Sequence, residues 1–270
     1  MTALPAPNLP ASRFRLALLW SIARLTLLEN WRNRLPWAVV LLVGLGWGLA
    51  AFLAEAAAME TLKMQSALLG ALFRLEAVFL VSVATIAGAA REIHDRLLEV
   101  LLAMPMPRFA HFLGKLTGHA MVACLVAMAF GAALLPFAPA TQVLLWSLSL
   151  AGELILMAAL GLLLVLTWAQ VPLALTAAMG FYLLARSTGA LILMAAGPFP
   201  AYTSRVGQWE GAILTALSWL LPGLERFTPS DWLVYHTGQW SDLAGILLET
   251  SLYLLFIIGV GLFDLYRKNV

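Results

Sequence analysis

The 270-residue sequence is poor in charge and has almost no cysteine. Only 11% of its residues are Asp, Glu, Lys or Arg, whereas soluble domains average about 25%. Its single cysteine, Cys124, excludes a disulfide framework within one chain and any metal site built on several cysteines. The sequence also has no block of Lys and Arg, so nothing in it indicates nucleic-acid binding.

The sequence lacks the motifs of the common catalytic and metal-binding sites. Gly114-Lys115 has neither the upstream Gly nor the following Ser or Thr of a phosphate-binding loop, and no Gly-x-Ser-x-Gly nucleophile elbow is present. None of the histidines has a ligand spacing such as His-Glu-x-x-His; they are His94, His111, His119 and His236. We therefore expect a non-catalytic chain that binds no cofactor and no metal.

Long apolar runs are abundant, because 62% of the residues are hydrophobic. A run of about 20 apolar residues crosses a bilayer as a helix. The pattern predicts an all-α polytopic membrane protein that forms a single transmembrane domain over residues 1–270. The six expected spans are 35–58, 67–90, 112–135, 143–168, 172–196 and 243–262. Residues 1–12 are Pro-rich and contain no apolar core of a cleavable signal peptide.

Three segments outside these spans have patterns of their own. Residues 13–34 carry five arginines among Leu, Ile, Phe and Trp, which favours an interfacial amphipathic helix over a short soluble helix. The outer segment, residues 198–242, contains the apolar run Trp209 to Pro222, which is too short to span. We interpret it as one or two short helices that dip into the outer leaflet before the last span. The third segment, residues 91–111, links the second and third spans.

The positions of the basic residues predict the orientation of the chain. With the N-terminus inside the cell, eleven Lys and Arg residues fall on the cytoplasmic side and three fall outside: Lys63, Arg205 and Arg226. An excess of Lys and Arg in cytoplasmic segments is typical of membrane proteins. The counts therefore predict a multi-pass protein of the inner (plasma) membrane with both termini in the cytoplasm, which needs an even number of spans.

The link after the second span has the pattern of a helix that docks onto a soluble protein. Ile93, Leu97, Val100 and Leu101 share one helical face. On the polar side, two charge pairs have i,i+4 spacing: Arg91 with Asp95 and Glu92 with Arg96. Pro105 ends the helix, because the residue before a proline avoids the α region. The alternative is an ordinary charged loop.

The same stretch carries a family resemblance. The residues involved are Glu92, Glu99, Leu101, Leu102, Pro105, Arg108, Gly114 and Lys115. In this order they resemble the signature of the ABC-2 type transporter permeases, the membrane subunits of ABC exporters; Pro107 departs from it, since a small polar residue is commoner there. Arg32-Asn33-Arg34 and the stretch from Leu221 to Phe227 are similar to the branch related to copper-enzyme maturation.

The resemblance implies that the chain is a permease subunit whose ATP is handled by a separate chain. A second permease copy, in a homodimer or a heterodimer, would pair with two P-loop ATPase subunits that bind ATP and Mg. Residues 91–111 would form the coupling helix, which docks into a cleft of each ATPase. Membrane lipid and an outer-side partner are further expected contacts. The ATPase-coupling residues implied are Arg91, Glu92, Asp95, Arg96, Glu99, Pro105 and Arg108.

Ionisable residues inside the spans are costly and are functional candidates by default. They are Arg74, Glu76, Glu153 and Arg186. Glu153 and Arg186 fall near the middle of their spans, where they can pair, whereas Arg74 and Glu76 point in different directions on one helix. These residues either lock helices together or line a substrate path. Gly44 and Gly48 form a Gly-x-x-x-Gly pattern that favours the first span as a dimer interface.

Two other functions compete with the ABC-2 interpretation. The first is a proton-coupled secondary transporter that uses the buried charges as a relay; such proteins often have broken spans in matching halves, which this sequence does not show clearly. The second is a non-transporting membrane scaffold that carries the signal of an ATPase to an outer partner.

Overall fold

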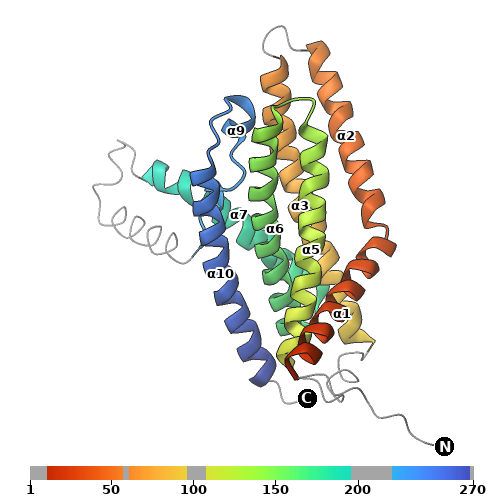
Figure 1. Cartoon of the computed structure of the whole chain (residues 1–270). Helices are drawn as coiled ribbons and strands as arrows, with labels where there is room; N and C mark the ends of the chain where they lie inside the picture. The colour runs from red at the N-terminus through yellow and green to blue at the C-terminus, as the bar shows by residue number, and fades with distance from the viewer. Residues whose placement is uncertain (1–10, 57–60, 96–107, 196–220, 268–270) are drawn as a thin grey trace, which may run out of the picture.

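The protein is a bundle of long helices (Figure 1). The computed structural model describes residues 11–56, 61–95, 108–195 and 221–267, and every regular element within these ranges is a helix. Six of these helices are long and apolar enough to cross a membrane. The prediction of an all-α polytopic membrane protein is confirmed.

The described elements follow the expected order closely. They are α1 (Ala11–Arg32), α2 (Leu35–Ala56), α3 (Thr61–His94), α5 (Arg108–Leu134), α6 (Ala140–Trp168), α7 (Val171–Ala195), the 3-10 turn η2 (Leu224–Arg226), α9 (Ser230–Val234) and α10 (Trp240–Arg267). The main difference is α3, which is 34 residues long. Residues 91–94, expected in the link after the second span, continue this helix instead.

The start of α1 and the end of α10 lie at the same end of the bundle. Figure 1 shows the first turn of α1 and the last turn of α10 together, with α9 and the turn between α5 and α6 at the opposite end. We refer to these as the α1 end and the α9 end. This arrangement agrees with an even number of spans.

Local sequence signals account for the sharp turns between helices. At the elbow between α1 and α2, Arg34 adopts a left-handed backbone with φ of 63°, and Pro36 sits in the first turn of α2, where its missing N–H is harmless. At the other tight turn, Ala169 is left-handed and its N–H closes α6 on the carbonyl of Val165 at 2.8 Å. Pro172 then lies in the first turn of α7.

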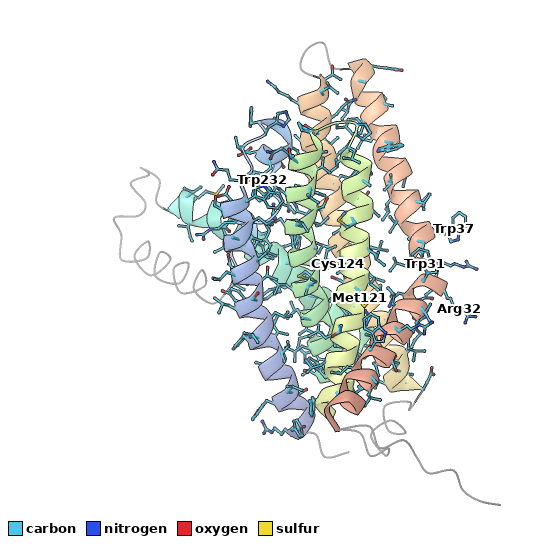
Figure 2. All side chains as sticks on the ribbon, in the orientation of Figure 1. Trp31, Arg32, Trp37, Met121, Cys124 and Trp232 are labelled. Atoms are coloured by element: carbon cyan, nitrogen blue, oxygen red, sulfur yellow. The ribbon has the colours of Figure 1, made fainter. Side chains whose placement is uncertain are left out.

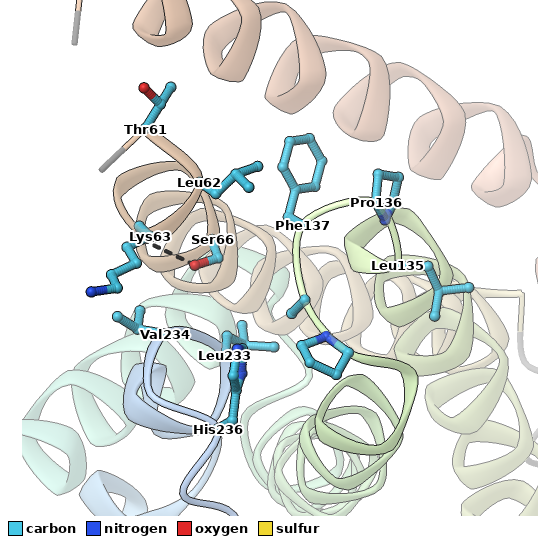
Figure 3. Close-up of a pocket in the computed structure, with 12 residues that line it drawn as sticks. Thr61, Leu62, Lys63, Ser66, Leu135, Pro136, Phe137, Leu233, Val234 and His236 are labelled. Carbon is cyan, nitrogen blue, oxygen red and sulfur yellow. Dashed lines mark hydrogen bonds between the residues drawn. The ribbon is translucent and has the colours of Figure 1, made fainter. Parts of the chain in front are cut away.

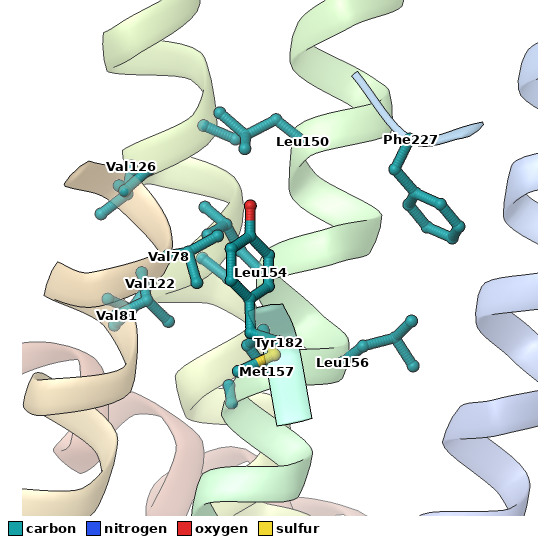
Figure 4. Close-up of a cluster of buried hydrophobic side chains, with 14 of the residues drawn as sticks. Val78, Val81, Val122, Val126, Leu150, Leu154, Leu156, Met157, Tyr182 and Phe227 are labelled. Carbon is teal, nitrogen blue, oxygen red and sulfur yellow. The ribbon is translucent and has the colours of Figure 1, made fainter. Parts of the chain in front are cut away.

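The core lies where α3, α5, α6 and α7 meet. Phe73 of α3 and Phe130 of α5 pack with ring centroids 5.2 Å apart, and Tyr182 of α7 points into a cluster of Val and Leu side chains (Figure 4). More than half of the apolar windows of α5 and α6 is buried, against 17% for α2 and 22% for α7 and α10. The last three helices therefore present large apolar faces outward, as expected in a bilayer.

Helix α1 packs on α5 through two glycines. A Cβ atom added to Gly114 would lie 2.9 Å from the Cβ of Ile22, and one added to Gly118 would lie 2.9 Å from the carbonyl oxygen of Ala23. Small residues four apart let two helix backbones approach closely. The outward side of α1 mixes exposed apolar residues, such as Trp20, with the exposed Arg24. The position of α1 at a membrane surface stays a prediction, because apolar and charged residues are mixed on this side rather than separated on two faces.

The part of the predicted outer segment that the structure describes folds back into the bundle. Residues 221–239, which we call the α9 segment, contain η2 and α9. Leu224, Phe227 and Leu233 are each at most 1% exposed. Trp232 is buried as well. The run from Trp209 to Leu220 lies outside the described residues.

The close contact between α1 and α5 can be tested by filling it. Gly118→Leu is expected to lower stability by about 1–3 kcal/mol, because the side chain overpacks a contact between backbones. Gly180→Leu in α7 is the matched control, since Gly180 is exposed and nothing lies within 4 Å of an added Cβ. Thermal unfolding of both purified variants would measure the difference. Equal unfolding temperatures would contradict the packing.

Candidate functional site

A buried carboxylate is the centre of the first candidate site. Glu153 lies in the middle of α6 with an exposed fraction of 0%. Its Oε1 atom lies 3.5 Å from Nη1 of Arg186 on α7. The sequence predicted that these two residues can pair, and the structure brings them together. A buried charge needs such a partner, because burial removes the water that would otherwise solvate it.

The α9 segment closes over this pair with its backbone. Nη1 of Arg186 donates to the carbonyl oxygens of Leu224 at 2.6 Å and Phe227 at 2.9 Å. The hydroxyl of Thr228 donates to Oε2 of Glu153 at 3.0 Å. The guanidinium and the carboxylate therefore bind the same short stretch of chain, residues 224–228.

Two more helix residues complete this cluster. Ser149, one turn before Glu153 on α6, accepts the N–H of Thr228 at 3.0 Å. Arg74 of α3 donates to the carbonyl of Thr228 at 3.2 Å. Thr228 is fully buried with a left-handed φ of 47°. This conformation is costly for a residue with a Cβ and persists only where surrounding bonds fix it.

The two guanidinium groups here are balanced by two carboxylates only when Glu225 of the α9 segment is counted together with Glu153. Arg74 and Arg186 both act electrostatically on Glu153, and Glu225 acts on Arg186 from the α9 segment. Glu225 is itself positioned by the N–H of Gly189, which donates to its Oε2 at 3.1 Å. We call Arg74, Glu153, Arg186 and Thr228 the intrabundle cluster. It joins α3, α6 and α7 to the α9 segment.

The fourth predicted intramembrane ion, Glu76, is not part of this cluster. Its Oε2 is buried without a hydrogen-bond partner among the described residues. Two positions from Arg74 on α3, it points to another face of the helix, as its spacing predicted.

A second polar cluster lies at the α1 end. Lys115 of α5 has a side chain only 7% exposed and forms an ion pair with Glu92 of α3. Its Nζ also lies 3.9 Å from a carboxylate oxygen of Glu29 on α1. Arg91 of α3 lies 3.6 Å from Glu29 and donates to Oδ1 of Asn33 at 3.4 Å. We call these five residues the basal cluster, which ties α1, α3 and α5 together.

The predicted coupling residues are described only in part. Arg91 and Glu92 belong to the basal cluster, and Asp95 follows the last turn of α3. Arg108 is the first residue of α5, and its side chain is not described. Arg96, Glu99 and Pro105 lie outside the described residues. Within the described residues, the start of the predicted coupling segment (91–111) therefore lies on the basal cluster.

The sequence analysis missed Glu29 and Asn33. A signal for Glu29 was present, because it is the only acidic residue between Met1 and Phe52 and it follows a run of basic and apolar residues. A lone carboxylate among several cations is expected to pair with one of them. Which cation it finds depends on how α1 crosses α5, and this the sequence does not specify.

At the α9 end the bundle opens into a pocket of about 690 Å³. Figure 3 shows it between the start of α3, the turn from Leu135 to Pro139 and the end of α9. Lys63, Ser66 and His236 are its polar residues beside Thr61. It is separate from both clusters.

The predicted dimer glycines face no described part of the chain. Nothing lies within 4 Å of a Cβ added to Gly44 or Gly48. Gly46, between them, faces inward, where an added Cβ would clash with the ring of Phe73. One side of α2 therefore packs on α3, and the side with Gly44 and Gly48 is uncovered within one chain.

The intrabundle cluster predicts a large stability effect from a nearly isosteric change. Glu153→Gln is expected to cost about 3–5 kcal/mol, because it leaves Arg186 buried without its counter-charge. Glu76→Gln in α3 is the matched control and should cost much less, since the partnerless Oε2 of Glu76 has no described bond to lose. Chemical or thermal unfolding in detergent would compare the two. Equal losses in both variants would contradict the role of the ion pair.

The comparisons with known proteins add no identification to this geometry. No protein-family model matches the chain, and no curated protein is similar enough to match it. The resemblance to ABC-2 permeases therefore stays a prediction that rests on the residues themselves.

Proposed function

We propose that this chain is the membrane-spanning permease subunit of an ATP-binding cassette transporter of the exporter type. The supporting observation is the position of the coupling segment. It begins at Arg91 and Glu92, where one buried lysine, Lys115, joins α3, α5 and α1. A partner that moves this segment acts on three helices at once.

The proposal needs a second polypeptide, because the sequence contains no phosphate-binding loop. A soluble P-loop ATPase that binds ATP and Mg would supply the energy. Closure of two ATPase subunits would displace the coupling segments of two permease copies. The basal cluster would pass this displacement to the spans, and a substrate path between the copies would open or close.

The proposed orientation places the α1 end in the cytoplasm. The described basic residues at this end include Arg24, Arg32, Arg91 and Arg267, whereas Lys63 and Arg226 lie at the α9 end. Such a bias favours a cytoplasmic α1 end. The α9 segment would then cap the outer side, where it could gate an amphipathic or lipidic substrate.

A proton-coupled secondary transporter is the second candidate. One observation favours it: Glu153 is a fully buried carboxylate that bonds both a cation and a hydroxyl. Carboxylates in such positions mark proton pathways in some transporters. The same contacts also serve as a structural lock for the α9 segment, and we rank this candidate second for that reason.

Co-purification tests the proposed function directly. The tagged chain, extracted from its native membrane in mild detergent, should retain a P-loop ATPase at about one to one. Reversing two charges of the coupling segment, with Glu99→Lys and Arg108→Glu, should release that ATPase, because docking relies on these charges. Mass spectrometry and quantitative immunoblotting give the ratio.

A charge swap at the opposite end is the control. Arg226→Glu with Asp231→Lys changes two exposed residues of the α9 segment and should leave the ATPase bound. Absence of any ATPase, together with solute movement by the purified chain in proteoliposomes under a proton gradient alone, would overturn the proposal in favour of the second candidate.

The pairing of two permease copies has its own test. In a Cys124→Ser background, Gly44→Cys should form a disulfide-linked dimer in membranes, because Gly44 lies on the uncovered side of α2. Phe79→Cys on α3, at a position also well exposed, is the control and should stay monomeric. Non-reducing gels resolve the two outcomes. Equal cross-linking at both positions would reject α2 as the interface.

A further inference from the structure

Three polar side chains of α5 are buried inside the bundle. His111, Lys115 and His119 follow one another at intervals of four residues, which places them on one face of the helix. They are 8%, 6% and 3% exposed, whereas side chains such as Trp37 project away from the bundle (Figure 2). Nδ1 of His119 has a partner, since the hydroxyl of Thr85 on α3 lies 3.3 Å from it. Buried polar groups need such partners.

Lys115 and His111 have hydrogen-bonding capacity that no described residue uses. A lysine ammonium has three N–H donors. Lys115 directs one of them to Glu92, and the carboxylate oxygen of Glu29 at 3.9 Å is too far away for a second hydrogen bond. The Nδ1 atom of His111 is buried and has no hydrogen-bond partner within the described part of the chain.

A small cavity adjoins both groups. It has a volume of about 20 Å³, and its polar wall consists of Glu92, His111 and Lys115. Five apolar residues form the rest of the wall: Ala89, Phe112, Leu162, Leu166 and Leu265. Every residue of the wall is buried or half-buried. A buried water molecule needs roughly 10–15 Å³ and two to four polar partners, and this cavity provides both.

The charges beside the cavity favour a neutral occupant. The ammonium group of Lys115 repels a cation, and the carboxylate of Glu92 repels an anion. Organic ligands bind in pockets of about 300–1,000 Å³, so a cavity of about 20 Å³ is too small for them. A water molecule both donates and accepts hydrogen bonds, and it is therefore the occupant that matches these three side chains.

We propose that this cavity binds one water molecule between Glu92, His111 and Lys115. The water accepts from the Lys115 ammonium group and donates to an oxygen of Glu92 and to Nδ1 of His111. Three hydrogen bonds are typical of a buried water. Since Leu162 and Leu265 also line the cavity, the water lies where α3, α5, α6 and α10 meet. It completes the basal cluster, and this inference does not depend on the proposed transport function.

Oxidation by hydroxyl radicals that X-rays generate from water tests the site in the purified full-length chain. These radicals react before they diffuse far, so they oxidise a buried side chain only where a water lies beside it. Phe112 lines the cavity and is 1% exposed, and it should be oxidised. Phe73 is the control: it is 0% exposed, packs against Phe130 and should stay intact. Peptide mass spectrometry measures both.

A matched pair of variants separates a bound water from bulk water. Ala89→Val adds two methyl groups at the wall of the cavity and should displace the water, so that oxidation of Phe112 falls to the level of Phe73. Ala90→Val adds the same bulk at a neighbouring buried residue that does not line the cavity, and it should leave the oxidation of Phe112 unchanged. The unfolding temperatures of both variants show whether they fold.

A second measurement needs no variant. In solid-state NMR spectra of the wild-type chain in bilayers, magnetisation from water should reach the ring nitrogens of His111 but not those of His119, which Thr85 already bonds.

Three results would overturn the proposal. The first is a wild-type Phe112 as unreactive as Phe73, which would indicate a dry cavity. The second is oxidation of Phe112 that is unchanged in a folded Ala89→Val variant, or lost equally in both variants. The third is equal transfer of magnetisation from water to His111 and His119.

Discussion

The need to compensate one buried charge determines how the bundle is closed at its α9 end. Glu153 is removed from water on every side, and it is bonded by Arg186 and by the hydroxyl of Thr228. Arg74 in turn donates to the carbonyl of Thr228. Buried ions of this kind add little net stability, but the loss of one partner is expensive. The cluster therefore specifies the position of the α9 segment more than it strengthens the fold. The α9 segment contains only the short elements η2 and α9, so without these bonds little would fix it in a single conformation.

Much of the fold was predictable because the bilayer imposes a simple rule on sequence. Apolar runs of sufficient length become helices, so six spans and their order could be inferred from composition alone. The end of α3 could not, since the pattern predicts a helix after Arg91 but does not show that this helix continues the second span, where Glu92 pairs with Lys115. The candidate site was likewise predictable only in part. The pairing of Glu153 with Arg186 follows from their depth, whereas the carbonyls of Leu224 and Phe227 carry no side-chain signal in the sequence. Glu29 stands out in the sequence as the only acidic residue between Met1 and Phe52, but its partners depend on how α1 crosses α5.

The helices of the bundle differ in how much of their apolar surface is buried. α5 and α6 are mostly enclosed, while α2, α7 and α10 expose most of their apolar windows. In a soluble protein such faces would cause aggregation. In a bilayer they are neutral toward lipid, so association between helices there needs close packing rather than apolar area. The uncovered side of α2 at Gly44 and Gly48 offers such packing. An apolar groove where α1, α2 and α5 meet forms a recess in the same outer surface.

The length of α3 has a mechanical consequence. Its 34 residues measure about 51 Å at 1.5 Å per residue, well beyond a hydrocarbon core of about 30 Å. Arg74 of the intrabundle cluster and Glu92 of the basal cluster both belong to this one helix, about 27 Å apart along its axis. An α-helix without a proline in its interior is stiff along that axis, and α3 contains none. An axial shift of α3 at the basal cluster would therefore reach the intrabundle cluster almost undiminished, because one stiff stretch of helix joins them.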